Sequence, residues 1–351
     1  MKSAVDNATQ QGEPNSPSAK AETHEALRCT SATPLFQRLE WEHVFAVYGL
    51  KMRTLNADRD GHNVGRLPLV HLRSRLFGNQ LVSLPWFDAS QVSAVDDDAR
   101  AALVNQALEL AAEWGAHFVQ IRQSDATNYS THVRTDKVVQ RLKLEPDPAA
   151  LWSRLKATVR NQVRKAEKCG LFVQRGGAEM AKDFFDVYSR NMRDLGSPSH
   201  SRRLFEVLLD LFSREANVYL VRHENQVVGG GLTLDNGDTL EIPWASSLRE
   251  FNSCCVNHAM YWQILQDACR NGFTWFSFGS STPGSGPYRY KKQWQPEEVQ
   301  LYWYFLSRKG EIATAAAMPP KEKFGLASRI WQRFPLWLSR SLGPWIMSQV
   351  A

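Results

Sequence analysis

The 351-residue sequence contains no run of 18 or more apolar residues, so it predicts no membrane-spanning helix. Its first 26 residues have no apolar core segment and carry four acidic side chains. This composition argues against a secretory signal and an Arg-rich transit peptide, and it predicts a disordered tail. The five cysteines include no C-x-x-C pair, and their odd number argues against a disulfide framework. We therefore expect a cytoplasmic protein with reduced thiols.

Signatures of metal and nucleotide sites are also missing. The nine histidines show neither H-E-x-x-H nor another paired ligand spacing, so we expect no metal site. The sequence contains no G-x-x-x-x-G-K and no G-x-G-x-x-G, which argues against a P-loop and against a dinucleotide-binding fingerprint.

Positive charge is concentrated in one segment. The net charge is +6, and residues 151–175 hold seven basic residues against the single acid Glu167, so the rest of the chain sums to zero. Four basic residues at every fourth position would form one stripe on a helix. They are Lys156, Arg160, Arg164 and Lys168. Such a stripe is typical of a surface that binds phosphate groups of tRNA, of a nucleotide diphosphate or of a polyprenyl diphosphate, and equally of a solvated face. Both interpretations stay open.

Hydrophobic periodicity predicts alternating helices and strands along the chain. Helices are expected over residues 35–48, 96–114, 151–169, 181–194, 202–213 and 256–270. Strands are expected over 51–55, 64–72, 79–85, 117–122, 218–223, 226–234, 239–245, 273–278 and 299–306. The EPDP run at 145–148 interrupts the pattern. The sequence thus predicts an α/β fold with mixed sheets, divided into a tail (1–26), a first domain (27–147), a second domain (148–310) and a basic aromatic C-terminal tail (311–351).

A segment rich in glycine and proline, Phe276–Trp294, follows one of the predicted strands and reads FSFGSSTPGSGPYRYKKQW. It presents five aromatic or basic residues in succession, namely Tyr288, Arg289, Tyr290, Lys291 and Lys292. In an edge strand, Arg289 and Lys291 would face one side, and the other three would face the opposite side. A cleft wall and an amphipathic surface edge both fit this pattern.

Four segments together resemble the FemAB-like family of the GNAT (acyl-CoA N-acyltransferase) superfamily. They are RNQVRKAEKCG at 160–170, NMRDLGSP at 191–198, GRLPLVHLRSRLFGNQLVSLPW at 65–86, and Gly272–Trp294. The versions NMRDLG and STPGSGPYRYKKQW are most similar to FemAB-like proteins associated with PEP-CTERM/exosortase and exopolysaccharide loci. The resemblance implies a pair of tandem GNAT-like domains.

The resemblance also implies an activity, the transfer of an activated acyl or aminoacyl group to an amine on a cell-envelope or exopolysaccharide precursor. The donor, an aminoacyl-tRNA, an acyl-CoA or an acyl carrier, would be a cosubstrate, and no tightly bound cofactor is expected. In the family the aromatic-Lys pair lies in the catalytic cleft, which implies catalytic roles for Tyr290 and Lys291 and substrate contacts for Tyr288, Arg289 and Lys292. A CoA- or carrier-dependent N-acyltransferase and a non-enzymatic adaptor in exopolysaccharide assembly are the alternatives.

The sequence departs from its relatives in two places. Their first domain carries Y-G-G after an S-x-P element, whereas residues 84–92 read LPWFDASQV here. The [QR]-x-x-G-x-[GA] loop of ordinary CoA-dependent acetyltransferases is missing, and residues 247–258 (SLREFNSCCVNH) contain no glycine at all. Close approach of backbone N–H groups to a pyrophosphate favours glycine, so this departure argues against a CoA donor.

Three single residues are further candidates. Arg193 precedes a helix-stop signal and would contact an acceptor amine or carboxylate, or else pair with its neighbour Asp194. Glu241, in the strand TLEIPWAS, would act as a general base if burial raised its pKa, or else lie on an exposed sheet face. Asn257 is expected to cap the helix 256–270.

Residues 321–351 carry five basic residues and one acidic residue among many aromatic and aliphatic side chains. Pro335 and Pro344 are expected to divide this segment into short pieces. Trp and Arg at this density are typical of peripheral contact with an anionic surface, here the inner face of the cytoplasmic membrane. Docking of the segment onto the first domain is the alternative.

Overall fold

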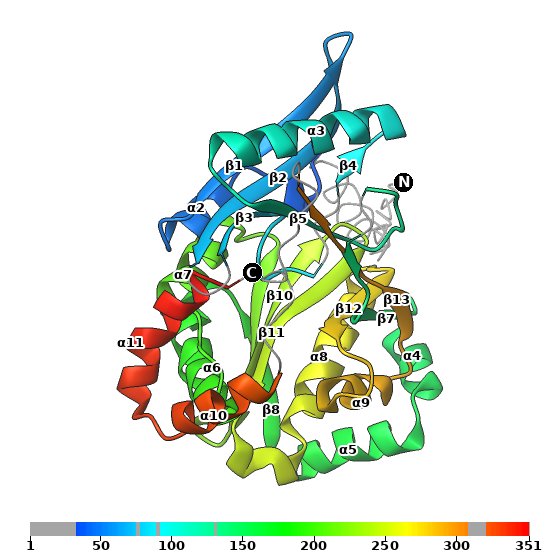
Figure 1. Ribbon diagram of the computed structural model, residues 1–351. Coiled ribbons are helices and arrows are strands. Elements are labelled where there is room, and N and C mark those ends of the chain that lie inside the picture. The colour runs from blue at the N-terminus through cyan, green and yellow to red at the C-terminus, as the bar shows by residue number, and fades with distance from the viewer. Residues whose placement is uncertain (1–32, 75–77, 89–91, 130–131, 308–320, 351) are drawn as a thin grey trace, which may run out of the picture. The chain divides into compact units, whose positions relative to one another are not determined.

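The computed structural model describes residues 33–74, 78–88, 92–129, 132–307 and 321–350. The predicted tail 1–26, Cys29 and residues 308–320 lie outside this description. The described chain forms two mixed sheets of seven strands each, with helices packed on them (Figure 1).

The first sheet has the strand order β1-β2-β3-β5-β14-β6, and β4 pairs with β2. Its strands are β1 (Lys51–Arg59), β2 (His62–Ser74), β3 (Gly78–Val82), β4 (Ser93–Ala94), β5 (Phe118–Gln123), β6 (Val133–Arg134) and β14 (Tyr302–Leu306). Only β3 and β5 run parallel. Helix α3 (Asp97–Glu113) connects the first four strands to β5 and packs on β1 and β2. Its first turn is capped by Asp96, whose carboxylate accepts a hydrogen bond from the Ala99 N–H at 2.8 Å.

The second sheet has the order β13-β7-β12-β11-β10-β9-β8. Its strands are β7 (Val138–Lys143), β8 (Leu171–Gly176), β9 (Ala216–His223), β10 (Gln226–Asn236), β11 (Thr239–Ser247), β12 (Trp275–Ser281) and β13 (Glu297–Gln300). The helices of this half are α4 (Pro148–Arg154), α5 (Ala157–Lys168), η2 (Ala178–Met180), α6 (Ala181–Leu195), α7 (Arg202–Leu211), η3 (Arg249–Cys254), α8 (Val256–Arg270) and α9 (Gly286–Lys292). β11 and β12 are the parallel pair, and α8 connects them.

Three consecutive glycines in β10 allow helices to approach both faces of this sheet. A Cβ at Gly229 would lie 2.4 Å from Val256 of α8, and one at Gly230 would lie 3.1 Å from Phe184 of α6. Successive strand residues point to opposite faces, so α8 covers one face and α6 covers the other (Figure 1).

The chain exchanges strands between the two sheets. β7 lies within the predicted first-domain range but pairs with β12 and β13 of the second sheet. The predicted single strand 299–306 is wrong, because it divides at the buried Leu301 into β13 and β14, which belong to different sheets. The pairing of strands therefore does not follow the division at residue 147/148, and the domain ranges themselves stay a prediction.

Local differences from the predicted helices have simple causes. The helix expected over 151–169 breaks into α4 and α5, because Leu155 and Lys156 adopt extended ψ angles of 146° and 143° and the Leu155 side chain is buried. The helix expected over 35–48 is reduced to η1 (Leu35–Gln37) and α2 (Trp41–Ala46). Asn257 is not the cap of α8, since Cys255 holds that position with φ of 58°.

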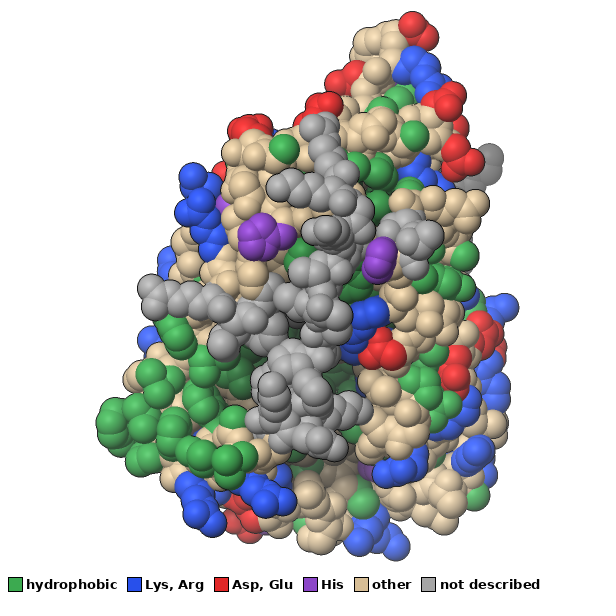
Figure 2. All heavy atoms as spheres, in the orientation of Figure 1, with side chains coloured by type: hydrophobic (Ala, Val, Ile, Leu, Met, Phe, Trp, Pro, Cys, Tyr) green, Lys and Arg blue, Asp and Glu red, His purple; other side chains and the backbone are tan. Residues whose placement is uncertain are grey.

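The C-terminal segment forms two helices, α10 (Lys321–Trp331) and α11 (Leu336–Met347), both of which contact α6. Pro335 separates them as expected, but Pro344 lies inside α11 and does not end it. The Val350 carbonyl accepts a hydrogen bond from the Trp86 ring N–H at 2.9 Å. Hydrophobic side chains gather on the surface where these helices lie (Figure 2). Within the described chain, none of the helices has the length and apolar character needed to cross a bilayer.

Candidate active site

A pocket lies where two parallel strands separate. β11 and β12 pair only over Thr239–Glu241 and Trp275–Ser277. Both Ile242 and Phe278, the next residue on each strand, line the pocket, which has a volume of about 510 Å³. This volume falls in the range of roughly 300–1,000 Å³ that is typical of small-molecule sites. The separation of β11 from β12 therefore opens the pocket, and no extra segment inserted into the sheet is needed to form it.

Five parts of the chain line this pocket: the end of α6, β11 beyond Glu241, the segment 249–261, Phe278 of β12, and α9. The polar lining residues are Asn191, Ser246, Ser247, Arg249, Asn252, Asn257 and Lys291. The Asn191 amide donates a hydrogen bond to the Ser246 hydroxyl at 3.1 Å. Of these seven, the sequence predicted a site role for Lys291 alone, although Asn191 and Asn257 fall in segments that it singled out.

The Tyr-Arg-Tyr-Lys-Lys run forms helix α9, so the predicted edge strand and its sidedness are wrong. The Ser285 hydroxyl accepts a hydrogen bond from the Tyr288 N–H at 3.3 Å and so caps the helix. Helical spacing then places Tyr288 and Lys292 on one side, where both contact the Glu298 carboxylate. Tyr290 and Lys291 line the pocket instead.

The Lys291 side chain reaches the turn that follows β12. Its ammonium donates hydrogen bonds to the carbonyl oxygens of Gly279 at 3.1 Å and Ser280 at 2.8 Å. Burial lowers the pKa of Lys291 to about 8, although the Asp88 carboxylate nearby acts in the opposite direction. The amine is thus protonated at pH 7. An ammonium has three N–H donors, so one remains for a ligand in the pocket.

Asp88 connects the first sheet to this turn and was not predicted. It follows β3, and its carboxylate accepts hydrogen bonds from the Ser280 N–H at 2.6 Å and from the Ser280 hydroxyl. Its charge also raises the pKa values of Arg122 and Lys137, against the stronger effect of burial. The Asp88 carboxylate is therefore the anion shared by three partly or fully buried cations, those of Arg122, Lys137 and Lys291.

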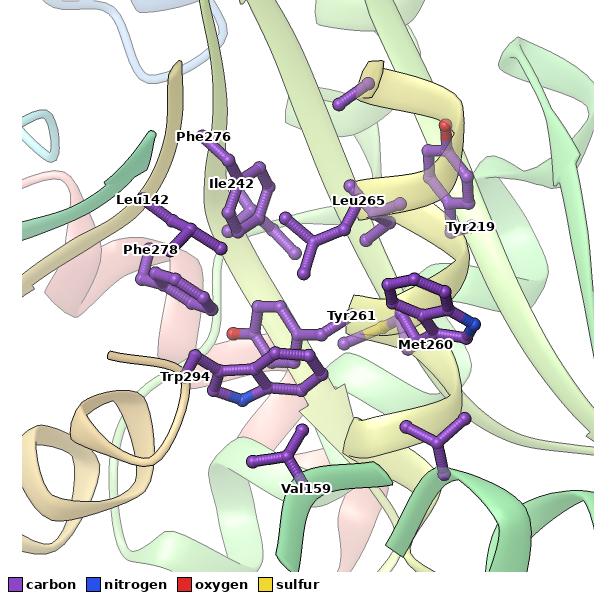
Figure 3. Packing of buried hydrophobic residues seen from close by; sticks show 14 of the residues in the cluster. Leu142, Val159, Tyr219, Ile242, Met260, Tyr261, Leu265, Phe276, Phe278 and Trp294 are labelled. Carbon is purple, nitrogen blue, oxygen red and sulfur yellow. The ribbon is translucent and has the colours of Figure 1, made fainter. Parts of the chain in front are cut away.

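Tyr290 forms a neutral wall of the pocket. Its ring packs edge-on against His258, with centroids 5.1 Å apart, and lies 5.8 Å from the Tyr261 ring. Burial raises the pKa of Tyr290 well above its usual range and lowers the pKa of His258 to about 4. Both side chains are uncharged at pH 7. Tyr261 and Trp294 extend this wall into the core, with their rings beside Phe278 (Figure 3).

Glu241 is the last residue before the strands separate and is not among the pocket-lining residues. Its carboxylate accepts a hydrogen bond from the Asn236 amide at 3.0 Å. Burial raises the pKa of Glu241 to about 7, and the Asp88 charge adds to this rise. A pKa near 7 suits a general base, but Glu241 lies beside the pocket and does not line it. Its catalytic role stays a prediction.

Replacing Glu241 with Gln is expected to change the pH dependence of stability. The folded-state pKa of about 7 lies above the ordinary 4.5, so the folded state binds more protons between these values and stability falls as pH rises through this window. The variant lacks this fall, and at pH 8 we expect it to be more stable by up to about 2 kcal/mol. Urea unfolding at pH 5 and pH 8 measures the difference, with the exposed Glu42→Gln as control. Equal pH dependence in Glu241→Gln and wild type would show that the carboxyl is not perturbed.

The other predicted substrate contacts lie outside the pocket lining. The Arg193 guanidinium pairs with the adjacent Asp194 carboxylate at 2.7 Å, as the ion-pair interpretation expected. Arg289 is exposed and donates to the Gly284 carbonyl at 2.9 Å. The basic stripe lies on α5, which buries Val159 and Val163 and leaves the four basic residues at the surface. They are Lys156, Arg160, Arg164 and Lys168. Their roles in substrate binding stay predictions.

Comparisons with known proteins agree with this architecture. Residues 153–292 match the family model of the acetyltransferase (GNAT) domain, a range that contains most of the pocket lining. The chain shares its fold with the crystal structure of FemX, with a TM-score of 0.61 and 16% identity over 82% of this chain and 96% of that chain. No match was found among curated protein sequences.

Two further solved structures are similar. The C-terminal domain (DUF2156) of a putative lysylphosphatidylglycerol synthetase from Agrobacterium fabrum has a TM-score of 0.55 and 12% identity, covering 85% of this chain and 94% of that chain. L-PGS from Bacillus licheniformis has a TM-score of 0.52 and 13% identity, covering 93% and 100%. At these identities the similarity establishes the fold. The predicted fold class, α/β with mixed sheets and GNAT-like domains, is confirmed, and the GNAT match supports an acyltransferase.

Proposed function

We propose that the protein transfers an activated acyl or aminoacyl group to an amine on a cell-envelope or exopolysaccharide precursor, in a PEP-CTERM/exosortase-associated setting. The observation that carries the proposal is the buried Lys291 ammonium beside a pocket between two separated strands, inside the segment that matches the GNAT domain. The name of one similar structure combines a lysyl group with phosphatidylglycerol. This name favours an aminoacyl donor here.

The pocket groups suit the chemistry of acyl transfer. The acceptor amine attacks the carbonyl carbon of the donor, and the carbonyl oxygen gains negative charge. The free N–H of Lys291 would donate a hydrogen bond to this oxygen and stabilise the charge. The intermediate then expels the donor's alcohol or thiol, and the amine loses one proton to the leaving group or to water. Lys291 orients the donor carbonyl and stabilises the charge on its oxygen, so the lysine itself is unchanged at the end of the reaction.

An aminoacyl-tRNA donor would use the basic residues of α5. Arg160, Arg164 and Lys168 stand one helical turn apart, with Lys156 at the N-cap, and such spacing suits contact with successive phosphates. Steep weakening of tRNA binding with salt is expected, and salt-independent binding would contradict this contact.

The proposal is tested by mass spectrometry of the envelope and exopolysaccharide precursor pool from cells with and without the gene. We expect an amine-bearing precursor that gains the mass of one acyl or aminoacyl group only when the gene is present. Identical pools, combined with no binding of any acyl donor, would instead support a non-enzymatic adaptor.

A CoA- or carrier-protein-dependent N-acyltransferase is the second candidate, because the matching family model describes an acetyltransferase. The glycine-free residues 249–254 form η3 beside the pocket, where glycine would be favoured for pyrophosphate binding. We therefore expect calorimetry to show no tight binding of acetyl-CoA. A dissociation constant near about 1 µM, equivalent to roughly −8 kcal/mol, would favour this second candidate.

A further inference from the structure

The C-terminal helices expose a continuous set of large apolar side chains, which we call the α10–α11 face. Trp337 and Trp345 of α11 are 68% and 62% exposed. The face consists of Leu326, Ile330, Trp337, Leu342 and Trp345. Hydrophobic side chains gather on the left and lower left of the molecule in Figure 2, over the region where Figure 1 shows helices α10 and α11. Five large exposed apolar residues on two short helices form a patch that a soluble monomer rarely leaves uncovered.

The opposite side of α11 is held firmly against α6. Arg340 pairs with the Asp186 carboxylate at 2.8 Å and donates to the Ser189 hydroxyl at 2.9 Å. Gly343 is buried so closely that a Cβ there would lie 2.7 Å from the Ser199 carbonyl oxygen. These contacts fix the rotation of α11 about its axis. The two tryptophans therefore point outward because the helix is docked, and rotation of α11 cannot bring them into the core.

Helix α10 contacts the chain at the rim of the pocket. Leu195, the last residue of α6, lines the pocket and is 52% exposed. The next residue, Gly196, has φ of 77°, and a Cβ there would lie 2.7 Å from the Ser328 carbonyl oxygen of α10. An exposed apolar residue of the pocket lining therefore lies one position from the contact between α6 and α10.

The charge around this face indicates what covers it. Arg329 and Arg333 are exposed beside the apolar residues. Tryptophan is favoured at the boundary between lipid chains and headgroups, and arginine is attracted to anionic headgroups. A second copy of the chain would bring the same positive charge to the contact and is disfavoured.

We propose that the α10–α11 face docks on an anionic lipid bilayer and places the pocket mouth at the lipid surface. Trp337 and Trp345 enter the headgroup boundary, and Arg329 and Arg333 contact lipid phosphates. This inference rests on the proposed function in one respect: the acceptor amine would belong to a lipid or a lipid-linked precursor, which reaches the pocket past Leu195. Docking itself does not depend on transfer.

The test is cosedimentation of the full-length protein with vesicles of phosphatidylglycerol and phosphatidylcholine, compared with vesicles of phosphatidylcholine alone. We expect binding to the anionic vesicles that weakens with salt. The double variant Trp337→Ala/Trp345→Ala should bind these vesicles about tenfold more weakly. The matched control is Phe172→Ala/Leu39→Ala, which removes two large exposed apolar side chains elsewhere (51% and 60% exposed) and should bind like the wild type. Unchanged circular dichroism and melting temperature would show that both variants fold.

Three outcomes would overturn the proposal: no binding of the wild type to anionic vesicles, equal binding of the tryptophan double variant, or a wild-type dimer in sedimentation velocity that the double variant does not form. Acyl transfer by a wild-type protein that does not bind the anionic vesicles would refute docking and leave the proposed function intact. Vesicle binding by a protein without transferase activity would support docking and refute the proposed function.

Discussion

Lys291→Ala is expected to lower the rate of acyl transfer about 100- to 1,000-fold, the effect of removing one oxyanion donor. The measurement is a single-turnover rate with the precursor identified by the mass comparison. The wild-type rate should fall above about pH 8, because the Lys291 pKa is about 8 and only the protonated amine donates to the oxyanion. Lys291→Arg stays protonated at high pH. Its rate should be lower than that of the wild type at pH 7 but should not fall as the pH rises.

The control for Lys291 is Lys143→Ala, which removes an exposed lysine at the end of β7. We expect a wild-type rate and pH profile from it. If Lys291→Ala reacted at the wild-type rate, the assignment of Lys291 would be wrong. A wild-type rate that stays constant between pH 7 and pH 10 would show that Lys291 does not act through its charge.

The Lys291 side chain should also lower the free energy of unfolding of the protein at neutral pH. Its folded-state pKa of about 8 lies below the ordinary 10.5, so the unfolded state binds more protons between these values and stability rises with pH through this window. At pH 7 the buried ammonium is protonated and unfavourable. Lys291→Met should therefore be more stable than the wild type at pH 7 by about 2 kcal/mol while it loses activity. A gain in stability together with a loss of rate is not expected for a purely structural lysine.

Asp88→Ala is expected to destabilise the fold by about 3 kcal/mol, because it leaves buried cations without their anion. The Ser280 N–H and hydroxyl also lose their acceptor. The pKa of Lys291 should fall further, since Asp88 raises it in the wild type. The decline in rate at high pH should therefore begin at a lower pH in any variant that still folds.

Asp88→Asn separates the two effects of Asp88. The amide oxygen still accepts one hydrogen bond from Ser280, while the charge is gone. We expect a smaller loss of stability than in Asp88→Ala but a similar shift of the pH–rate profile. The exposed Asp210→Ala is the control and should change neither quantity. A wild-type pH profile in Asp88→Asn would contradict electrostatic coupling between Asp88 and Lys291.

Local sequence patterns predicted much of this fold. The predicted bounds of the helix 256–270 coincide with α8. The predicted hairpin of β10 and β11 is present, with Gly237 in the turn as expected, although Asn236 still pairs with Thr239 and the second turn residue is Asp238. Such elements are readable because each depends on a few neighbouring residues, such as a turn glycine with φ of 72° at Gly237. The resemblance of four separate segments predicted the GNAT-like architecture and placed Tyr290 and Lys291 at the pocket.

What could not be predicted depends on contacts between distant parts of the chain. Asp88 and Ser280 are 192 positions apart, and nothing in LPWFDASQV distinguishes this carboxylate from an exposed one. Residues 297–306 contain no glycine, proline, asparagine or aspartate, so the sequence gave no sign that the chain leaves one sheet for the other at Leu301. The basic run 288–292 fits a strand edge as well as a helix, and the Ser285 cap with Pro287 in the first turn was the available signal for α9.

Complementation of cells that lack the gene tests most directly whether Lys291 belongs to an acyl-transfer site. The cells receive the wild type, Lys291→Ala or Lys143→Ala, each expressed at the same level, and the precursor pool is analysed by mass spectrometry. We expect the wild type and Lys143→Ala to restore a precursor heavier by one acyl or aminoacyl group, whereas Lys291→Ala leaves the unmodified precursor to accumulate. Equal restoration by Lys291→Ala would show that Lys291 does not belong to such a site.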